Sequence, residues 1–235
     1  MEAVSRARLA QLAGAFAAAL ACAVLAPSAL ACRSGYSYAG LYALRPATGI
    51  GASLSMLDAP TVAGGHVAAW VGFGGPGLGP HGTDEWLQVG LASFDSPAGR
   101  LYYELALPGQ EPKYVELASG IELGHVVRVA VMELPLSHDD WIVITPTGIE
   151  GPFHLPHSHA AWAPIATAES WARGGSYCNA YAYRFGDIEL AHAGGSWTRL
   201  RRSEKLQDPG WRVNLLSRST FSATAVRGAR LLRRP

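Results

Sequence analysis

The sequence of 235 residues has few cysteines and no long hydrophobic run. Cys22 lies in an apolar segment near the N-terminus, which leaves Cys32 and Cys178 as candidates for one disulfide in an oxidising compartment. The uncharged run at 9–25 is 17 residues long, whereas a membrane-spanning helix needs about 20 strongly apolar residues. These scarcities argue against a retained membrane anchor and limit the mature chain to at most one disulfide.

The first 31 residues are predicted to be a secretory signal peptide. Two arginines precede the uncharged run, and Pro27 and the small-residue sequence at 29–31 (ALA) follow it. Cleavage after residue 31 would leave 204 residues, enough for one well-buried domain. We expect that domain at 32–226, followed by a basic C-terminal tail at 227–235, in a secreted, periplasmic or extracellular protein. The alternative is a lipid anchor at Cys32, since 29–32 (ALAC) is similar to a lipoprotein cleavage site.

Charged residues balance overall and are unevenly distributed. The first 31 residues hold two of the 19 basic and one of the 18 acidic side chains, so 17 of each remain. From Arg199 onward nine arginines and Lys205 stand against Glu204 and Asp208, a surplus of eight positive charges. This end is expected to be a solvated edge, with contact to an anionic lipid or polysaccharide envelope as the alternative. Basic and aromatic residues do not interleave as on nucleic-acid-binding surfaces, so no nucleic-acid partner is expected.

Helical periodicity is almost absent beyond the signal segment. Short alternating or β-branched runs recur between clusters of Gly, Pro, Asp and Ser, which is typical of an all-β protein. Strands without crossover helices must bury their apolar faces sheet against sheet, so the sequence predicts a two-sheet antiparallel β-sandwich or jelly roll. Segment 33–48 is left open as a propeptide or a first strand. Strands are expected at 51–56, 67–73, 85–94, 100–107, 126–134, 141–145, 167–172, 181–187 and 219–225.

Several common catalytic motifs are missing or lack their context. The run at 72–77 (GFGGPG) matches a dinucleotide-binding pattern, but Pro76 prevents the helix that such a site requires. There is no G-x-S-x-G elbow, and the adjacent residues at 137–139 (SHD) cannot stack into a triad. The stretches at 74–82 and 146–164 are expected to be loops, and loops of that length often carry function.

Three histidines in the second of these loops could contribute to a metal site. His154, His157 and His159 lie within six residues but among prolines, with no cysteine or carboxylate beside them to complete a ligand set. We therefore predict no metal and no cofactor, and an exposed loop that gains positive charge in acid.

Aromatic and polar side chains are expected to share one concave sheet face. Strand alternation places Gln88 beside Trp86, opposite an aliphatic face, and Glu169 two residues from Trp171. A glutamate can take a proton from a bound water, while a glutamine N–H donates to the oxygen that becomes negative as a carbonyl is attacked. The face is completed by Trp70, Tyr102 and Glu104.

The order of these segments resembles that of the glutamic peptidases, or eqolisins, a family of secreted, acid-active endopeptidases with a concanavalin A-like β-sandwich. Family-like runs occur at 69–72 (AWVG), 87–90 (LQVG), 102–104 (YYE, followed by Pro108) and 168–169 (AE). The resemblance covers about 51–187. It implies a catalytic dyad of Gln88 and Glu169, supported by Trp70 and Glu104, and a polypeptide substrate.

The chain departs from the family at two positions on this face. Fungal members usually carry acids where this chain has Gly74 and Ala92, and such losses change the hydrogen bonding around the dyad. Two hypotheses follow. The first is a secreted endopeptidase in which Glu169 is the general base and Gln88 stabilises the oxyanion. The alternative is a non-catalytic sandwich that binds polysaccharide or peptide on Trp70, Trp86, Tyr102 and Trp171.

Overall fold

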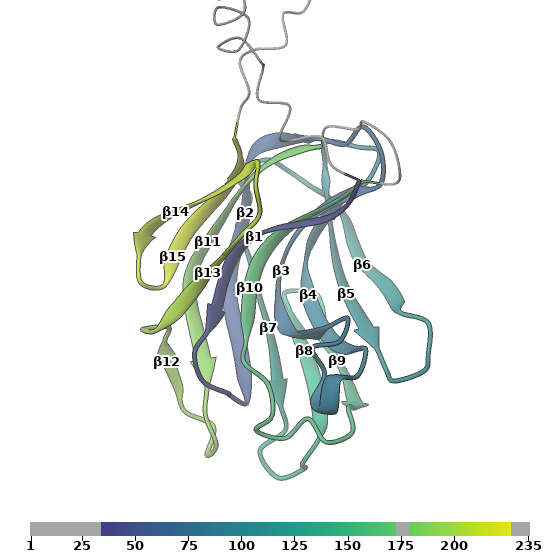
Figure 1. Cartoon of the computed structure of the whole chain (residues 1–235), viewed down its shortest axis with the longest axis vertical. Helices are drawn as coiled ribbons and strands as arrows, with labels where there is room; N and C mark the ends of the chain where they lie inside the picture. The colour runs from purple at the N-terminus through teal and green to yellow at the C-terminus, as the bar shows by residue number, and fades with distance from the viewer. Residues whose placement is uncertain (1–33, 173–178, 227–235) are drawn as a thin grey trace, which may run out of the picture. The chain divides into compact units, whose positions relative to one another are not determined.

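The computed structural model of the chain describes residues 34–172 and 179–226 (Figure 1). The expected signal peptide at 1–31, both cysteines of the expected disulfide, Cys32 and Cys178, and the expected tail at 227–235 lie outside these ranges. No helix among the described residues is long and apolar enough to cross a bilayer.

Two antiparallel sheets pack against each other, and both layers can be followed in Figure 1. This arrangement confirms the predicted two-sheet antiparallel β-sandwich. The first sheet has seven strands in the order β13-β1-β10-β3-β4-β5-β6, and the second runs β14-β15-β11-β2-β7-β8-β9, with β12 paired to β11. The strands are β1 (Gly35–Ala43), β2 (Gly49–Thr61), β3 (His66–Gly75), β4 (Glu85–Ser93), β5 (Gly99–Ala106), β6 (Lys113–Ile121), β7 (Val127–Glu133), β8 (Asp140–Thr145), β9 (Gly148–His154), β10 (Ile165–Ala172), β11 (Ala180–Ala191), β12 (Trp197–Arg199), β13 (Ser203–Gln207), β14 (Trp211–Ser217) and β15 (Thr220–Ala225).

The core lies between the sheets and follows directly from strand alternation. Along the centres of β3 and β4, at 67–73 and 87–91, every second residue is apolar and fully buried, as with Val71, Phe73 and Val89. Phe73 meets Trp141 of the second sheet with ring centroids 4.7 Å apart. Each fully buried side chain of this size contributes about 1.5–3 kcal/mol relative to exposure. Because one face of β3 and β4 is committed to this core, the other face is free to carry a site.

All nine expected strands are strands in the structure, while other strands were not expected. The segment left open at 33–48 contains β1, which lies between β13 and β10 in the first sheet. The expected loop at 146–164 contains β9, an edge strand whose residues are mostly exposed. Gly, Ser and Ala make up much of β1 and weaken its strand pattern, while β9 has little to bury and shows no hydrophobic alternation.

Candidate active site

The predicted dyad residues project from the same face of the first sheet. Residues directly opposite each other in antiparallel strands point to the same side. Gln88 on β4 lies opposite Gly72 on β3, and Glu169 on β10 lies opposite Ala68 on β3. Since 68 and 72 are an even number of residues apart on one strand, both side chains face away from the core. Residues 81 positions apart in sequence are thus brought to one surface by a single intervening strand.

This surface is hollowed into two clefts. The main cleft has a volume of about 330 Å³ and the side cleft about 340 Å³. His66, Glu104 and Glu169 line both, so the two clefts meet at these residues. We call the combined depression the groove. The main cleft is also lined by Tyr36, Tyr38, Trp70, Gly74, Gly75, Pro76, Leu78, Trp86, Gln88, Ile165 and Leu206.

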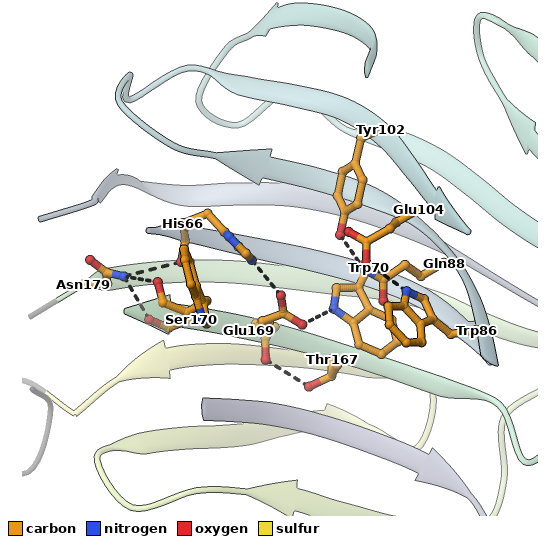
Figure 2. Close-up of polar contacts among 12 residues, drawn as sticks. His66, Trp70, Trp86, Gln88, Tyr102, Glu104, Thr167, Glu169, Ser170 and Asn179 are labelled. Carbon is orange, nitrogen blue, oxygen red and sulfur yellow. Dashed lines mark hydrogen bonds and ion pairs between the residues drawn. The ribbon is translucent and has the colours of Figure 1, made fainter. Parts of the chain in front are cut away.

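Glu169 is a buried carboxylate, 5% exposed, held from two sides (Figure 2). Trp70 donates its indole N–H to Glu169 Oε2 over 3.0 Å, and His66 Nε2 lies 2.8 Å from Oε1. An ionised carboxylate can accept about four hydrogen bonds. These two contacts therefore fix the position of Glu169 while leaving lone pairs that could accept from a bound water.

His66 was not predicted, and its contact with Glu169 is the shorter of the two that hold this carboxyl group. Its ring packs against Phe94 and Trp171 at centroid distances of 5.6 Å, and against Tyr36 at 6.4 Å. Buried Asn179 links the loop before β3 to β10, because its amide donates to the carbonyl oxygen of Gly64 in that loop and to that of Trp171 on β10. The imidazole of His66 is therefore positioned by aromatic packing, and the loop that leads into its strand is fixed by the Asn179 hydrogen bonds.

Gln88 is held by the hydroxyl of a neighbouring tyrosine. Its Nε2 donates to Tyr102 Oη over 3.2 Å, and burial raises the pKa of Tyr102 far above its ordinary value, so this oxygen remains a neutral hydroxyl. A glutamine amide has two N–H groups. No described residue accepts from the second one, so this N–H can donate to a ligand in the main cleft.

Glu104 lies opposite Gln88 in the register of β4 and β5. Trp86 donates its indole N–H to Glu104 Oε1 over 2.9 Å. Burial raises the pKa of Glu104, and the negative charge of Glu169 raises it further, against the opposing effects of the Trp86 hydrogen bond and His66. The groove thus contains a second carboxyl group that retains its proton to higher pH than an exposed glutamate.

Two glycines on this face let the strands approach closely. A Cβ on Gly90 would lie 2.0 Å from the carbonyl oxygen of Ala69, and one on Gly72 would lie 2.3 Å from that of Leu87. Any larger residue would push β3 and β4 apart. The spacing between Trp70 and Gln88 therefore depends on glycine at both positions.

The structure places most of the predicted site residues in the groove and one beside it. Trp70, Trp86, Gln88, Tyr102, Glu104 and Glu169 line the two clefts. Trp171 shares their face but lies to the side, where its ring packs against Tyr36 and His66. Gly74 lines the main cleft and Ala92 the side cleft, so the two expected departures from the family pattern fall within the groove.

Sequence reasoning missed several groove residues, and some could have been found. His66 is two and four residues from Ala68 and Trp70, so the alternation that placed Trp70 on this face also places His66 there. Tyr36 and Tyr38 show the same alternation in a segment left unassigned. Asn179 gives no local signal, because its role depends on contacts with residues more than a hundred positions away.

Comparison with solved structures finds peptidases of similar fold. A crystal structure of scytalido-glutamic peptidase with a transition state analog inhibitor aligns with a TM-score of 0.57 and 13% identity, covering 83% of this chain and 100% of that chain. The structure of SCP-B, a member of the eqolisin family of peptidases, in complex with the tripeptide Ala-Ile-His aligns with a TM-score of 0.54 and 15% identity, with the same coverage. No protein-family model matches the sequence, and neither does any curated protein. The chain therefore has the β-sandwich fold of the glutamic peptidases, as its motif order predicted.

Proposed function

We propose that this protein is an endopeptidase of the glutamic peptidase type, with Glu169 and Gln88 as its catalytic residues. The observation that carries the proposal is that both side chains line one cleft, on the outer face of a sandwich that shares its fold with glutamic peptidases. Each already has one or two fixed hydrogen-bond partners, so the pair is oriented before any substrate binds.

The proposed reaction is direct attack of water on a peptide carbonyl. Ionised Glu169 takes a proton as the water oxygen bonds to the carbonyl carbon, and the free N–H of Gln88 donates to the oxyanion that forms. Glu169 then returns the proton to the amide nitrogen as the C–N bond breaks. Glu104, in its protonated form, adds no second negative charge beside the oxyanion.

The shape of the groove supports a polypeptide as substrate. Glu104 and Glu169 lie where the two clefts meet, so an extended chain could occupy the groove on both sides of the reacting bond. The SCP-B structure contains a tripeptide. Tyr36, Trp70 and Trp86 offer aromatic surface for apolar side chains of the substrate.

Two variants test this proposal against a matched control. Cleavage of a denatured protein at about pH 4 should fall by at least 10²–10³-fold in Glu169→Gln and in Gln88→Ala, the scale on which loss of an oxyanion donor acts. Glu122→Gln changes an exposed glutamate outside the groove and should leave cleavage unchanged. Circular dichroism should show that all three variants are folded. Turnover equal to wild type in a folded Glu169→Gln protein would refute the mechanism.

A second candidate function is a non-catalytic module that binds peptide or polysaccharide in the same groove. It is favoured by Gly74 and Ala92, which stand where fungal family members usually carry acids. Binding on a glycan array that disappears in Trp86→Ala, without cleavage of protein between about pH 3 and 8 in the wild type, would support this alternative.

Secretion also belongs to the proposal. The N-terminal residues have the order of a signal peptide, and the mass of the mature protein would identify its first residue. A free N-terminus at Cys32 would support secretion, whereas an added lipid mass there would indicate an envelope anchor. The basic C-terminal residues would then contact anionic envelope components, which binding to anionic vesicles at low and high salt would test.

A further inference from the structure

We propose that Glu133, His138 and His159 form a binding site for a divalent transition metal ion, best suited to Zn²⁺. The site lies at the end of β7 in the second sheet. Its three residues line a further cleft, which shares no lining residue with the groove. It is therefore independent of the proposed peptidase chemistry.

The three side chains converge from separate parts of the chain. One ligand atom of each lies within 4.8 Å of the others. His159 Nδ1 is 2.9 Å from Glu133 Oε1 and 3.0 Å from Oε2, and the rings of His138 and His159 pack edge to face with centroids 4.0 Å apart. Ligand atoms around a tetrahedral Zn²⁺ at about 2.0–2.1 Å would be about 3.3 Å apart. A small rotation of His138 therefore brings all three into range.

The carboxylate is the unusual member of this group. The Glu133 side chain is only 4% exposed, whereas both histidines are exposed. A buried carboxylate is costly unless it is paired or coordinates a metal. Among the described residues its one side-chain partner is His159, and a bound cation would give the buried carboxyl group a second partner.

Asp139 ties both ligand loops to this carboxylate. Its backbone N–H donates to Glu133 Oε1 over 2.9 Å, and its own carboxylate accepts from the backbone N–H of His159 over 2.7 Å. Asp139 adopts a positive φ of 67°, which residues other than glycine rarely do. Partners of this kind, one step removed from the ion, commonly orient metal ligands.

Two imidazoles and one carboxylate are a ligand set that suits Zn²⁺ and leaves a fourth position open. The adjoining cleft has a volume of about 200 Å³, which is room for a water molecule as the fourth ligand. His192 lines the same cleft. Mg²⁺ prefers oxygen ligands and near-octahedral geometry, so the site should discriminate against it.

The sequence alone pointed away from this site because it lacked a carboxylate near the loop histidines. The structure separates those histidines: His154 pairs with Asp140, and the ring of His157 packs against His81. Only His159 joins the proposed site, and its carboxylate partner lies 26 positions earlier in the chain.

Titration calorimetry on the full chain, first stripped with a chelator, tests the proposal. Wild-type protein should bind one Zn²⁺, and Co²⁺ at the same site should give the visible absorption of tetrahedral coordination. His138→Ala and His159→Ala should each weaken binding by at least tenfold, because loss of even an outer-shell partner costs about 10–100-fold. Zn²⁺ should raise the unfolding midpoint of wild type and not of His138→Ala.

His125→Ala serves as the control, since His125 is exposed and lies outside the cleft. It should bind Zn²⁺ as wild type does. His138 is exposed in a turn, so its replacement should leave folding intact. Absence of Zn²⁺ binding in the wild type, wild-type affinity in His138→Ala and His159→Ala, or equal binding of Mg²⁺ would each overturn the proposal.

Discussion

Glu85 should make the fold more stable in acid than at neutral pH. It opens β4, the strand that carries Gln88, and adjoins the loop that walls the main cleft. Its side chain is 1% exposed, and Oε1 has no hydrogen-bond partner among the described residues. Burial raises the pKa of Glu85 from 4.5 to about 7; Asp139 adds to this rise, while the Thr83 hydrogen bond and His154 oppose it.

The sign and size of the effect follow from proton linkage. Between the ordinary pKa and the raised one, the folded state binds more protons than the unfolded state, so stability falls as pH increases through this window. At about 1.4 kcal/mol per unit, the shift from 4.5 to about 7 corresponds to an upper limit of about 3.5 kcal/mol. Below this window Glu85 is neutral in both states and the full stability is present.

Urea unfolding of wild type and Glu85→Gln, in chelator and at several pH values, measures this contribution. The side chain of the glutamine variant cannot ionise. The free energy of unfolding of wild type, measured relative to that of the variant, should therefore fall by about 1–3 kcal/mol between about pH 5 and pH 8. Exposed Glu111→Gln is the control and should change stability by less than about 0.5 kcal/mol at every pH. A difference between wild type and Glu85→Gln that stays constant across this range would refute the reasoning.

Three further predictions concern the groove. Gly90→Ala should lower the free energy of unfolding by about 1–3 kcal/mol or more, because the added Cβ would lie 2.0 Å from the Ala69 carbonyl oxygen. Gly186→Ala is the control in the same urea assay and should be tolerated, because no atom lies closer than 3.8 Å to its added Cβ. Asn179→Ala should lower the free energy of unfolding by about 1–3 kcal/mol, because the backbone groups of Ala63 and Gly64 lose their hydrogen bonds to the Asn179 side chain. Amide hydrogen exchange at 62–66 should become faster. If the proposed function holds, Glu104→Gln should keep acid activity and extend the pH–rate profile to higher pH. The wild-type carboxyl, whose pKa burial raises, adds a negative charge beside Glu169 once it ionises, and glutamine cannot. An unchanged profile would contradict this.

The sequence predicts the fold where alternation is strong and fails where it is weak. Val71, Val89 and their neighbours show a period of two, so the central strands and both faces of the first sheet could be predicted. The alternating Tyr36 and Tyr38 were overlooked because β1 is rich in small residues. Partners such as Asn179 depend on long-range contacts and leave no local pattern.

The groove is preorganised by contacts between neighbouring strands, and this property bears on which function is correct. Trp70 and His66 from β3 hold Glu169 on β10, and Tyr102 from β5 holds Gln88 on β4. These bonds form within the sandwich and require no ligand, so the spare N–H of Gln88 and the spare lone pairs of Glu169 are fixed in advance. Preorganised groups stabilise a transition state because they need not reorient as charge develops. A binding module would be served equally well by flexible polar side chains, so the rigidity of this pair favours catalysis.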